Sequence, residues 1–146
     1  MHKQLLISVS LFLMSKFLLG QTCCDTTGVF MIAEKPATPN ITYKQIEETL
    51  NTAVPIDHFI LPTDNVIKIR FIINCKGETL NYSKLSQLDN ELYNEIILTL
   101  KSTVSWTPAK QANRNVDIWK ILTISSKNGR FKILGERDLK DKKHIK

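Results

Sequence analysis

The sequence is poor in the residues that build specialised chemical sites. Its 146 residues include 3 cysteines, 3 histidines and 5 glycines, which excludes a dense disulfide scaffold and a collagen-like repeat. No CxxC or HExxH spacing predicts a metal site, and no glycine-rich loop precedes a helix to bind phosphate. What is present, 42% hydrophobic and 23% charged residues, indicates one globular domain and excludes a disordered chain. We therefore expect no metal and no cofactor.

The first 20 residues read separately from this domain. Lys3 precedes an apolar run from Leu5 to Met14, and a small residue, Gly20, closes the segment, as in a secretory signal peptide. A membrane span needs ~20 apolar residues, whereas Lys16 interrupts this run. The alternative is an uncleaved anchor whose lysine snorkels. We expect residues 1–20 to be a cleaved signal and the protein to reach the periplasm or cell envelope without an integral membrane span.

The cysteines lie in two places. Cys23 and Cys24 follow the predicted cleavage site, and Cys75 lies inside the domain. Export permits disulfides, so Cys75 can bridge to either of the pair, and the sequence does not choose between them. Acylation of Cys23 is a further alternative, although the residues before it match a lipobox poorly.

The first half of the chain predicts an arm, a helix and a hairpin. Prolines in residues 21–40 favour an extended arm. Apolar residues at helical spacing predict a helix over Thr42–Ala53, with Thr42 as N-cap. Strict alternation over Val66–Asn74 predicts a half-buried strand. A turn that contains Gly77 leads to a second, weaker strand over Glu78–Lys84, and the two form a hairpin.

The second half predicts another helix and more strands. Ser86–Asp89 has the form of a capping box, and apolar residues every four positions from Leu88 extend the helix toward Val104. Val116–Ser125 alternates as a strand, and Asn128-Gly129 indicates a hairpin to a short strand over Arg130–Leu134.

Together these elements define the expected fold class over residues 41–134. It is α+β, an antiparallel three- to four-stranded sheet with two helices on one face. Residues 135–146 read as a charged, solvated tail. Their lysines are not interleaved with aromatic residues, and we expect no nucleic-acid partner.

Enzyme chemistry has little support in the sequence. Only His58 among the histidines lies in the predicted fold, so a thiol enzyme that uses Cys75 and His58 is the remaining enzymatic alternative. Cys75 occupies a hairpin turn and no nucleophile elbow is present. We therefore predict that the protein is not an enzyme.

A strand edge offers a better candidate site. An unpaired strand can accept an extended peptide through its main chain, and Val116–Ser125 is the candidate strand. Two alternatives compete with this hypothesis. Trp119 can simply pack under the stems of Lys68 or Arg70, and the Asn128-Gly129 hairpin can cover the edge with the chain's own strand. The outward residues that would flank a docked peptide are Asp117, Trp119 and Ile121.

Four motifs in order resemble the C-terminal domain of TonB energy transducers in the form common in Bacteroidota. Val29–Pro39 is similar to the family's proline-containing lead into the first helix, Phe71–Glu78 to its hairpin, and Leu88–Leu92 to the start of its second helix. The most specific motif resembles the family's "W-x-P-G/A-x-x-x-G-x-P-V" and contains Trp106, Pro108, Gln111 and Val116.

The resemblance implies a periplasmic interaction domain that pairs a strand with an extended segment of an outer-membrane receptor, the TonB box. The chain departs from the family at Asn40-Ile41, at Pro62–Asn65 and at Asn113, where glycine is usual. A full membrane anchor and a long proline-rich spacer are also missing. We therefore expect a stand-alone exported relative, with an anchored accessory transducer as the alternative.

Overall fold

The computed structural model describes residues 24–134, except 57–58, 60 and 62–64. The predicted signal peptide, Cys23, His58 and the charged tail lie outside the described residues. Two helices and eight strands are described. They are β1 (Cys24–Phe30), β2 (Thr38–Pro39), α2 (Tyr43–Ala53), β3 (Val66–Ile73), β4 (Thr79–Lys84), α3 (Asn90–Thr103), β5 (Trp106–Thr107), β6 (Ala109–Gln111), β7 (Arg114–Lys127) and β8 (Arg130–Leu134).

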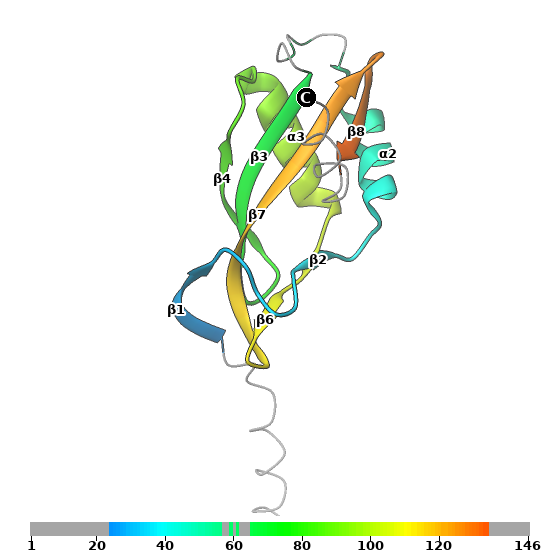
Figure 1. Cartoon of the computed structure of the whole chain (residues 1–146). Helices are drawn as coiled ribbons and strands as arrows, with labels where there is room; N and C mark the ends of the chain where they lie inside the picture. Colours follow the sequence, from blue (N-terminus) through cyan, green and yellow to red (C-terminus); the bar gives the residue numbers. More distant parts are fainter. Residues whose placement is uncertain (1–23, 57–58, 60, 62–64, 135–146) are drawn as a thin grey trace, which may run out of the picture.

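The α+β class is confirmed, and the expected strand count is too low. Six strands form one sheet, in which the order β1-β7-β3-β4 is joined by β6 and β8 on β7, and β2 pairs with β5 in a second, two-stranded sheet. All pairs are antiparallel except β1 with β7, which is parallel. In Figure 1, α3 lies behind the curled sheet, α2 lies at the right beside β8, and β7 runs through the whole length of the sheet. The added strands are short, or come from the expected arm.

Helix α2 forms where its sequence predicts. Thr42 accepts a hydrogen bond from the N–H of Gln45, and the Gln45 side chain accepts one from the N–H of Thr42, which completes a capping box. The apolar stripe places Ile46 and Leu50 in the core. The helix packs against α3 and β8.

The start of α3 corrects the predicted capping box. The N-cap is Asp89, whose carboxylate accepts from the N–H groups of Glu91 and Leu92. Ser86 instead accepts a hydrogen bond from the N–H of Lys68 at the start of β3. Ser86 and Asp89 are both residue types that suit an N-cap. Because Ser86 is bonded to β3, Asp89 caps the helix.

The core lies between the helices and one face of the sheet. On β3 the odd-numbered residues from Ile67 to Ile73 are buried on this face, and on β7 the even-numbered residues Val116, Ile118, Leu122 and Ile124 are buried on it. Trp106 also belongs to this cluster, with its ring centroid 5.6 Å from that of Phe71. The opposite face of β3 and β7 carries the residues that sequence alternation predicted to point outward.

Two features limit the outer edges of the sheet. The backbone of β8 is bonded by α2, because Asn51 donates to the carbonyl of Phe131 (2.9 Å) and accepts from its N–H (2.8 Å), and Glu47 accepts from the N–H of Ile133 (3.0 Å). Strand β4 has a bulge opposite Phe71, where Asn81 takes a φ of 51°.

A disulfide joins Cys24 at the start of β1 to Cys75 in the β3–β4 turn, with Cα atoms 5.5 Å apart. Of the bridges that the sequence left open, the structure contains the one between Cys75 and Cys24. In the same turn Gly77 has a φ of +84°, and a Cβ there would lie 2.1 Å from the carbonyl oxygen of Trp106. Only glycine fits this position, which brings the turn against the chain before β6.

Candidate functional site: a gap in the edge of β7

Strand β7 has neighbours on both edges, but one edge is incomplete. Along the first edge lie β6, which pairs with residues 114–116, and β3, which pairs with Ile118–Ser125. Along the opposite edge lie β1, up to Ile118, and β8, from Thr123. Among the described residues, no strand pairs with Trp119–Leu122 on this second edge. We call this stretch the gap.

The expected open edge is therefore much shorter than the strand. The sequence hypothesis considered all of Val116–Ser125, yet β1 covers the lower part of the second edge and β8 covers the upper part. The hairpin at Asn128-Gly129 accounts for the upper cover, as its turn sequence indicated. The lower cover comes from the arm, which pairs as a strand. Figure 1 shows β1 beside the lower half of β7 and β8 beside its upper end.

The peptide groups of Trp119 and Ile121 point into the gap. Along an antiparallel strand, the N–H and C=O of successive residues turn to alternate edges. The N–H of Ser126 donates to the carbonyl of Asn65 beside β3 (2.8 Å), so even-numbered residues of β7 turn toward β3. The main-chain groups of odd-numbered residues therefore turn toward the second edge. The two-residue turn agrees, because it pairs the backbone of Lys127 with that of Arg130 on β8.

A depression with a volume of about 520 Å³ lies at the gap. Its lining comes from the segment after β1, from β7 within the gap and from the end of β8, with Tyr43 and Arg70 beside them. Apolar side chains stand open to solvent here: Met31 is 71% exposed, Ile32 85% and Ile121 49%. A contact that covered them would gain ~25 cal/mol for each Å² buried, so the site suits an apolar ligand.

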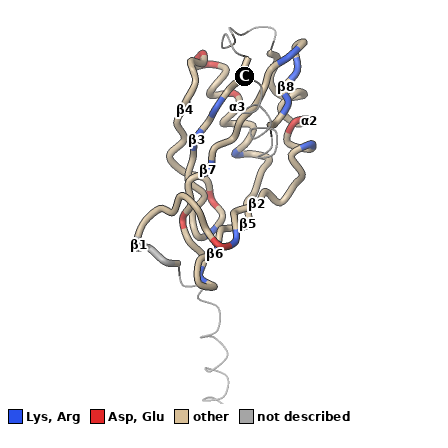
Figure 2. Tube along the Cα trace, viewed as in Figure 1, with Lys and Arg blue, Asp and Glu red and all other residues tan. Residues whose placement is uncertain are grey.

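Trp119 forms part of this lining and also packs against a cation. The guanidinium carbon of Arg70 lies 4.7 Å from the centroid of the indole ring. The alternative that Trp119 packs under Arg70 is thus confirmed, and it does not remove the residue from the site, because the ring is only half-buried. Charged groups that line the depression are Arg70 and Lys120, both cationic. Figure 2 shows that basic positions also lie on β3 and around the β7–β8 turn.

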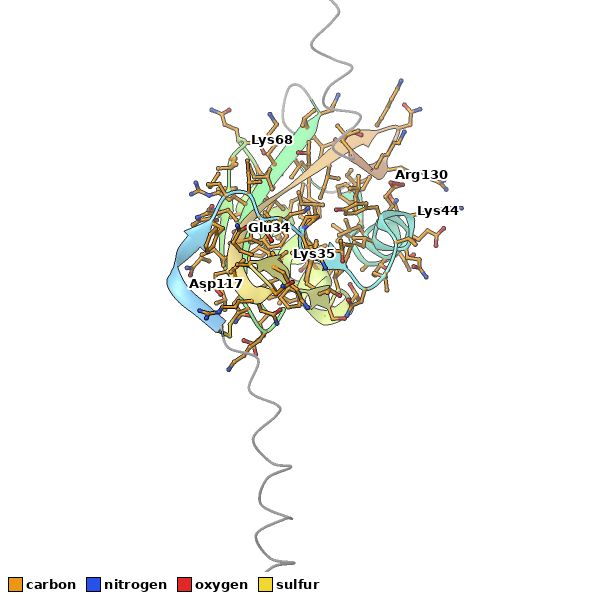
Figure 3. All side chains as sticks on the ribbon, turned by 60° about the horizontal axis from the view of Figure 1, so that its bottom comes forward. Glu34, Lys35, Lys44, Lys68, Asp117 and Arg130 are labelled. Atoms are coloured by element: carbon orange, nitrogen blue, oxygen red, sulfur yellow. A yellow bond between two sulfur atoms is a disulfide. The ribbon has the colours of Figure 1, made fainter. Side chains whose placement is uncertain are left out.

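Asp117 has a structural partner and does not line the depression. Its carboxylate accepts a hydrogen bond from the N–H of Cys75 (2.8 Å), and Asn115 donates to the carbonyl of Cys75 (3.1 Å). These two side chains fix the β3–β4 turn over β7. Figure 3 shows Asp117 close to β1, at the end of the sheet away from Lys68. Of the three expected binding residues, the structure brings Trp119 and Ile121 to one site.

The scaffold below the gap contains the residues of the most specific motif, Trp106, Pro108, Gln111 and Val116. Trp106 and Val116 are buried in the core. The Gln111 side chain accepts from the N–H of Glu34 and donates to its carboxylate, both at 3.1 Å. Pro108 lies between β5 and β6 and is half-buried. Gln111 therefore ties the segment after β1 to β6, near Glu34 and Lys35 in Figure 3.

The enzymatic alternative loses its nucleophile in this structure. The sulfur of Cys75 is bonded to Cys24, so no Cys75 thiol is available, and His58 lies outside the described residues. Across the described ranges, no three or more His, Cys, Asp or Glu side chains cluster as metal ligands do. No helix within the described part of the chain has the length and apolar character that crossing a membrane requires.

Two tyrosines with shifted acidity lie outside the depression. Burial raises the pKa of Tyr82 on β4 above its usual value, opposed by a hydrogen bond with Thr79, and Tyr93 on α3 adds a smaller rise. Burial also raises the pKa of Tyr93. Tyr82 stacks on Phe71 with ring centroids 5.0 Å apart, so its ring is part of the packing.

Sequence reasoning missed the residues that reach the site from the arm. The depression is lined by Met31, Ile32, Ala33 and Pro36. These residues were missed because no part of residues 21–40 alternates strongly enough to predict a paired strand. One signal was available: two adjacent large apolar residues, Met31-Ile32, in a segment between a strand-like run and two prolines. An exposed pair of this kind often marks a contact surface.

Comparisons with known proteins name no relative: no protein-family model, no curated protein and no solved structure matches the chain.

Proposed function

We propose that this protein is an exported, non-enzymatic interaction module that binds an extended segment of a partner protein by strand addition at the gap. The motif resemblance to TonB C-terminal domains supports the same class of function and suggests a segment of an outer-membrane receptor as partner. The module would then take part in the energising of transport across the cell envelope, or be related to proteins that do so.

One observation carries this proposal. At the gap, main-chain groups of Trp119 and Ile121 that point away from β3 meet no described strand, and exposed apolar side chains stand beside them. Strand addition needs this combination, because main-chain hydrogen bonds supply affinity and adjacent side-chain contacts supply specificity. Within the described part of the chain, the outer edge of β4 also lacks a partner strand and exposes Leu80, but the bulge at Asn81 interrupts it.

The gap also limits the length of the ligand. Four residues of β7 span roughly 13 Å at ~3.3 Å per residue, so three or four residues of a partner can pair there between β1 and β8. The cationic groups of Arg70 and Lys120 favour a segment that is neutral or carries a carboxylate, and disfavour a basic one.

The disulfide supports the exported location. Disulfides persist in oxidising compartments such as the bacterial periplasm and are rare in the cytosol. Cys24 and Cys75 form one that links the arm to the domain. This agrees with the secretory signal expected over residues 1–20.

A peptide titration followed by amide NMR tests the function. Apolar peptides of four to six residues, added to the oxidised protein, should shift the Trp119 and Ile121 resonances most. A peptide N-methylated at alternate amides should lose the effect, because it cannot donate to β7. Ile121→Lys should weaken binding at least tenfold. Leu98→Lys is the matched control, since Leu98 is an exposed apolar residue (62%) on α3.

Two results would contradict the proposal. The first is unchanged binding by the N-methylated peptide, which would indicate a side-chain pocket without strand pairing. The second is an equal loss of affinity in Ile121→Lys and Leu98→Lys, which would place the contact elsewhere or show that it is nonspecific.

A further inference from the structure

We propose that β1 is a displaceable cover on the second edge of β7, held closed by the Cys24–Cys75 disulfide, and that reduction by a dithiol opens the edge. Contacts within this structure alone support the release of β1. Its consequence for peptide binding rests on the proposed function. The inference concerns regulation of the gap and needs no ligand to be tested.

The described side chains of strand β1 contribute little to the core. Its pairing with β7 is split, since Cys24 and Asp25 pair with residues 115–116, Val29 and Phe30 pair with residues 117–118, and the register breaks between them. Val29 is 38% exposed and Phe30 is only partly buried against the core. No β1 side chain that the structure describes is a member of the buried core. Main-chain bonds and the disulfide therefore retain this strand.

The segment that follows β1 is anchored independently. Lys35 and Lys110 exchange backbone hydrogen bonds of 3.1 and 2.9 Å. Glu34 is bonded to Gln111 and also accepts from the N–H of Ala112 (3.2 Å). A movement of β1 would thus stop at Glu34. Residues before it can leave β7 while the rest of the arm remains on β6.

Cys75, the other cysteine of the disulfide, is also fixed in position by contacts other than the S–S bond. Both main-chain groups of Cys75 are bonded by β7 side chains, Asp117 and Asn115. Its turn is closed by the N–H of Gly77, which donates to the carbonyl of Asn74 (2.8 Å). Breaking the disulfide therefore leaves Cys75 in place and frees Cys24. The asymmetry directs the opening to β1.

The redox step is thiol–disulfide exchange. Both cysteines are partly exposed, so a thiolate of an external dithiol can reach a sulfur of the bond. Attack forms a mixed disulfide and releases one protein thiol, and the second thiol of the reductant then displaces the other. Two electrons and two protons pass to Cys24 and Cys75, and the reductant leaves as a disulfide.

Opening would double the length of the binding edge. With β1 displaced, the uncovered stretch of β7 extends from Asn115 to Leu122. Eight residues at ~3.3 Å span roughly 26 Å, which accommodates a complete strand of five or six residues. The oxidised protein would hold short segments, and the reduced protein would hold longer ones.

Hydrogen exchange tests the release. In the Cys23→Ser/Cys24→Ser variant, and in the native protein reduced with dithiothreitol, protection should fall at least tenfold at Asp117, whose main chain faces β1. Ile118 and Leu122 face β3 and should keep their protection. Cys23→Ser alone leaves the observed disulfide intact and serves as the matched control. Unchanged protection at Asp117 would overturn the proposal.

Peptide affinity tests the consequence. The variant lacking both early cysteines should bind an eight-residue apolar peptide at least tenfold more tightly than Cys23→Ser does. If Asp117 loses protection and the long peptide gains nothing, the regulatory proposal is wrong while short-peptide binding to Cys23→Ser still supports the proposed function. If neither form binds any peptide, the proposed function fails, and the exchange result alone decides whether β1 is displaceable.

Discussion

Strands β1 and β8 flank the same edge of β7 and are retained by different means. Strand β8 follows β7 through a two-residue turn, buries Phe131 and Ile133 in the core, and has its outer backbone bonded by α2. Strand β1 is parallel to β7, buries little and is tied by a disulfide. A strand retained by packing belongs to the folding unit, whereas one retained by a covalent tie can be released when the tie is cut.

The largest expected difference between β8 and β1 is the loss of stability when a phenylalanine on each strand is truncated. Phe131→Ala should lower the free energy of unfolding by about 3–5 kcal/mol, because it leaves a cavity in the core. Phe30→Ala on β1 should cost only about 1 kcal/mol, since its ring is partly exposed. Urea denaturation of both variants measures the two values. Equal losses would show that β1 belongs to the same cooperative unit as β8.

A smaller effect is expected where α2 bonds β8. Asn51→Ala removes both hydrogen bonds to the backbone of Phe131 and should cost about 1–3 kcal/mol. Asn40→Ala is a useful control, because Asn40 makes its side-chain hydrogen bonds with Ser105 and Thr107, away from β8. Hydrogen exchange should show faster exchange at Phe131 in the first variant only. Unchanged exchange there would mean that α2 does not secure β8.

The smallest expected effect is a loss of folding stability at alkaline pH. It should be the same whether β1 is attached or released. Burial raises the pKa of folded Tyr82 above its unfolded value of about 10, so the unfolded chain loses this proton first. Stability from this group is present below about pH 10 and is lost as the pH rises through the folded pKa. Tyr82→Phe keeps the ring on Phe71 and should reduce the alkaline loss. Denaturation between pH 8 and 11 measures it, and an identical slope in both proteins would contradict the prediction.

Much of the fold was predictable because its signals are local. Alternation from Ile67 to Ile73 identified β3, the apolar stripe of Ile46 and Leu50 identified α2, and Asn128-Gly129 identified the last hairpin. The added strands carry no such signal. A three-residue strand such as β6 is too short to show a period, and β1 pairs with residues about 90 positions later, which the arm itself does not encode.

The candidate site was predictable only in part, for the same reason. Alternation correctly placed Trp119 and Ile121 on the face away from the helices. Whether their strand was open depended on what lay along its edge, and that is a property of the whole chain. The role of Asp117 depended on the position of the Cys75 turn, and the contribution of Met31 and Ile32 depended on the path of the arm.

The bonding of β8 by α2 also bears on how the protein behaves at high concentration. A sheet whose two outermost strands were both bare could add further copies of itself at either end and grow into fibres. Here the outer backbone of β8 is bonded by side chains of α2, and β4 is distorted by its bulge at Asn81. Self-association through backbone pairing is thereby discouraged at β8 and at β4.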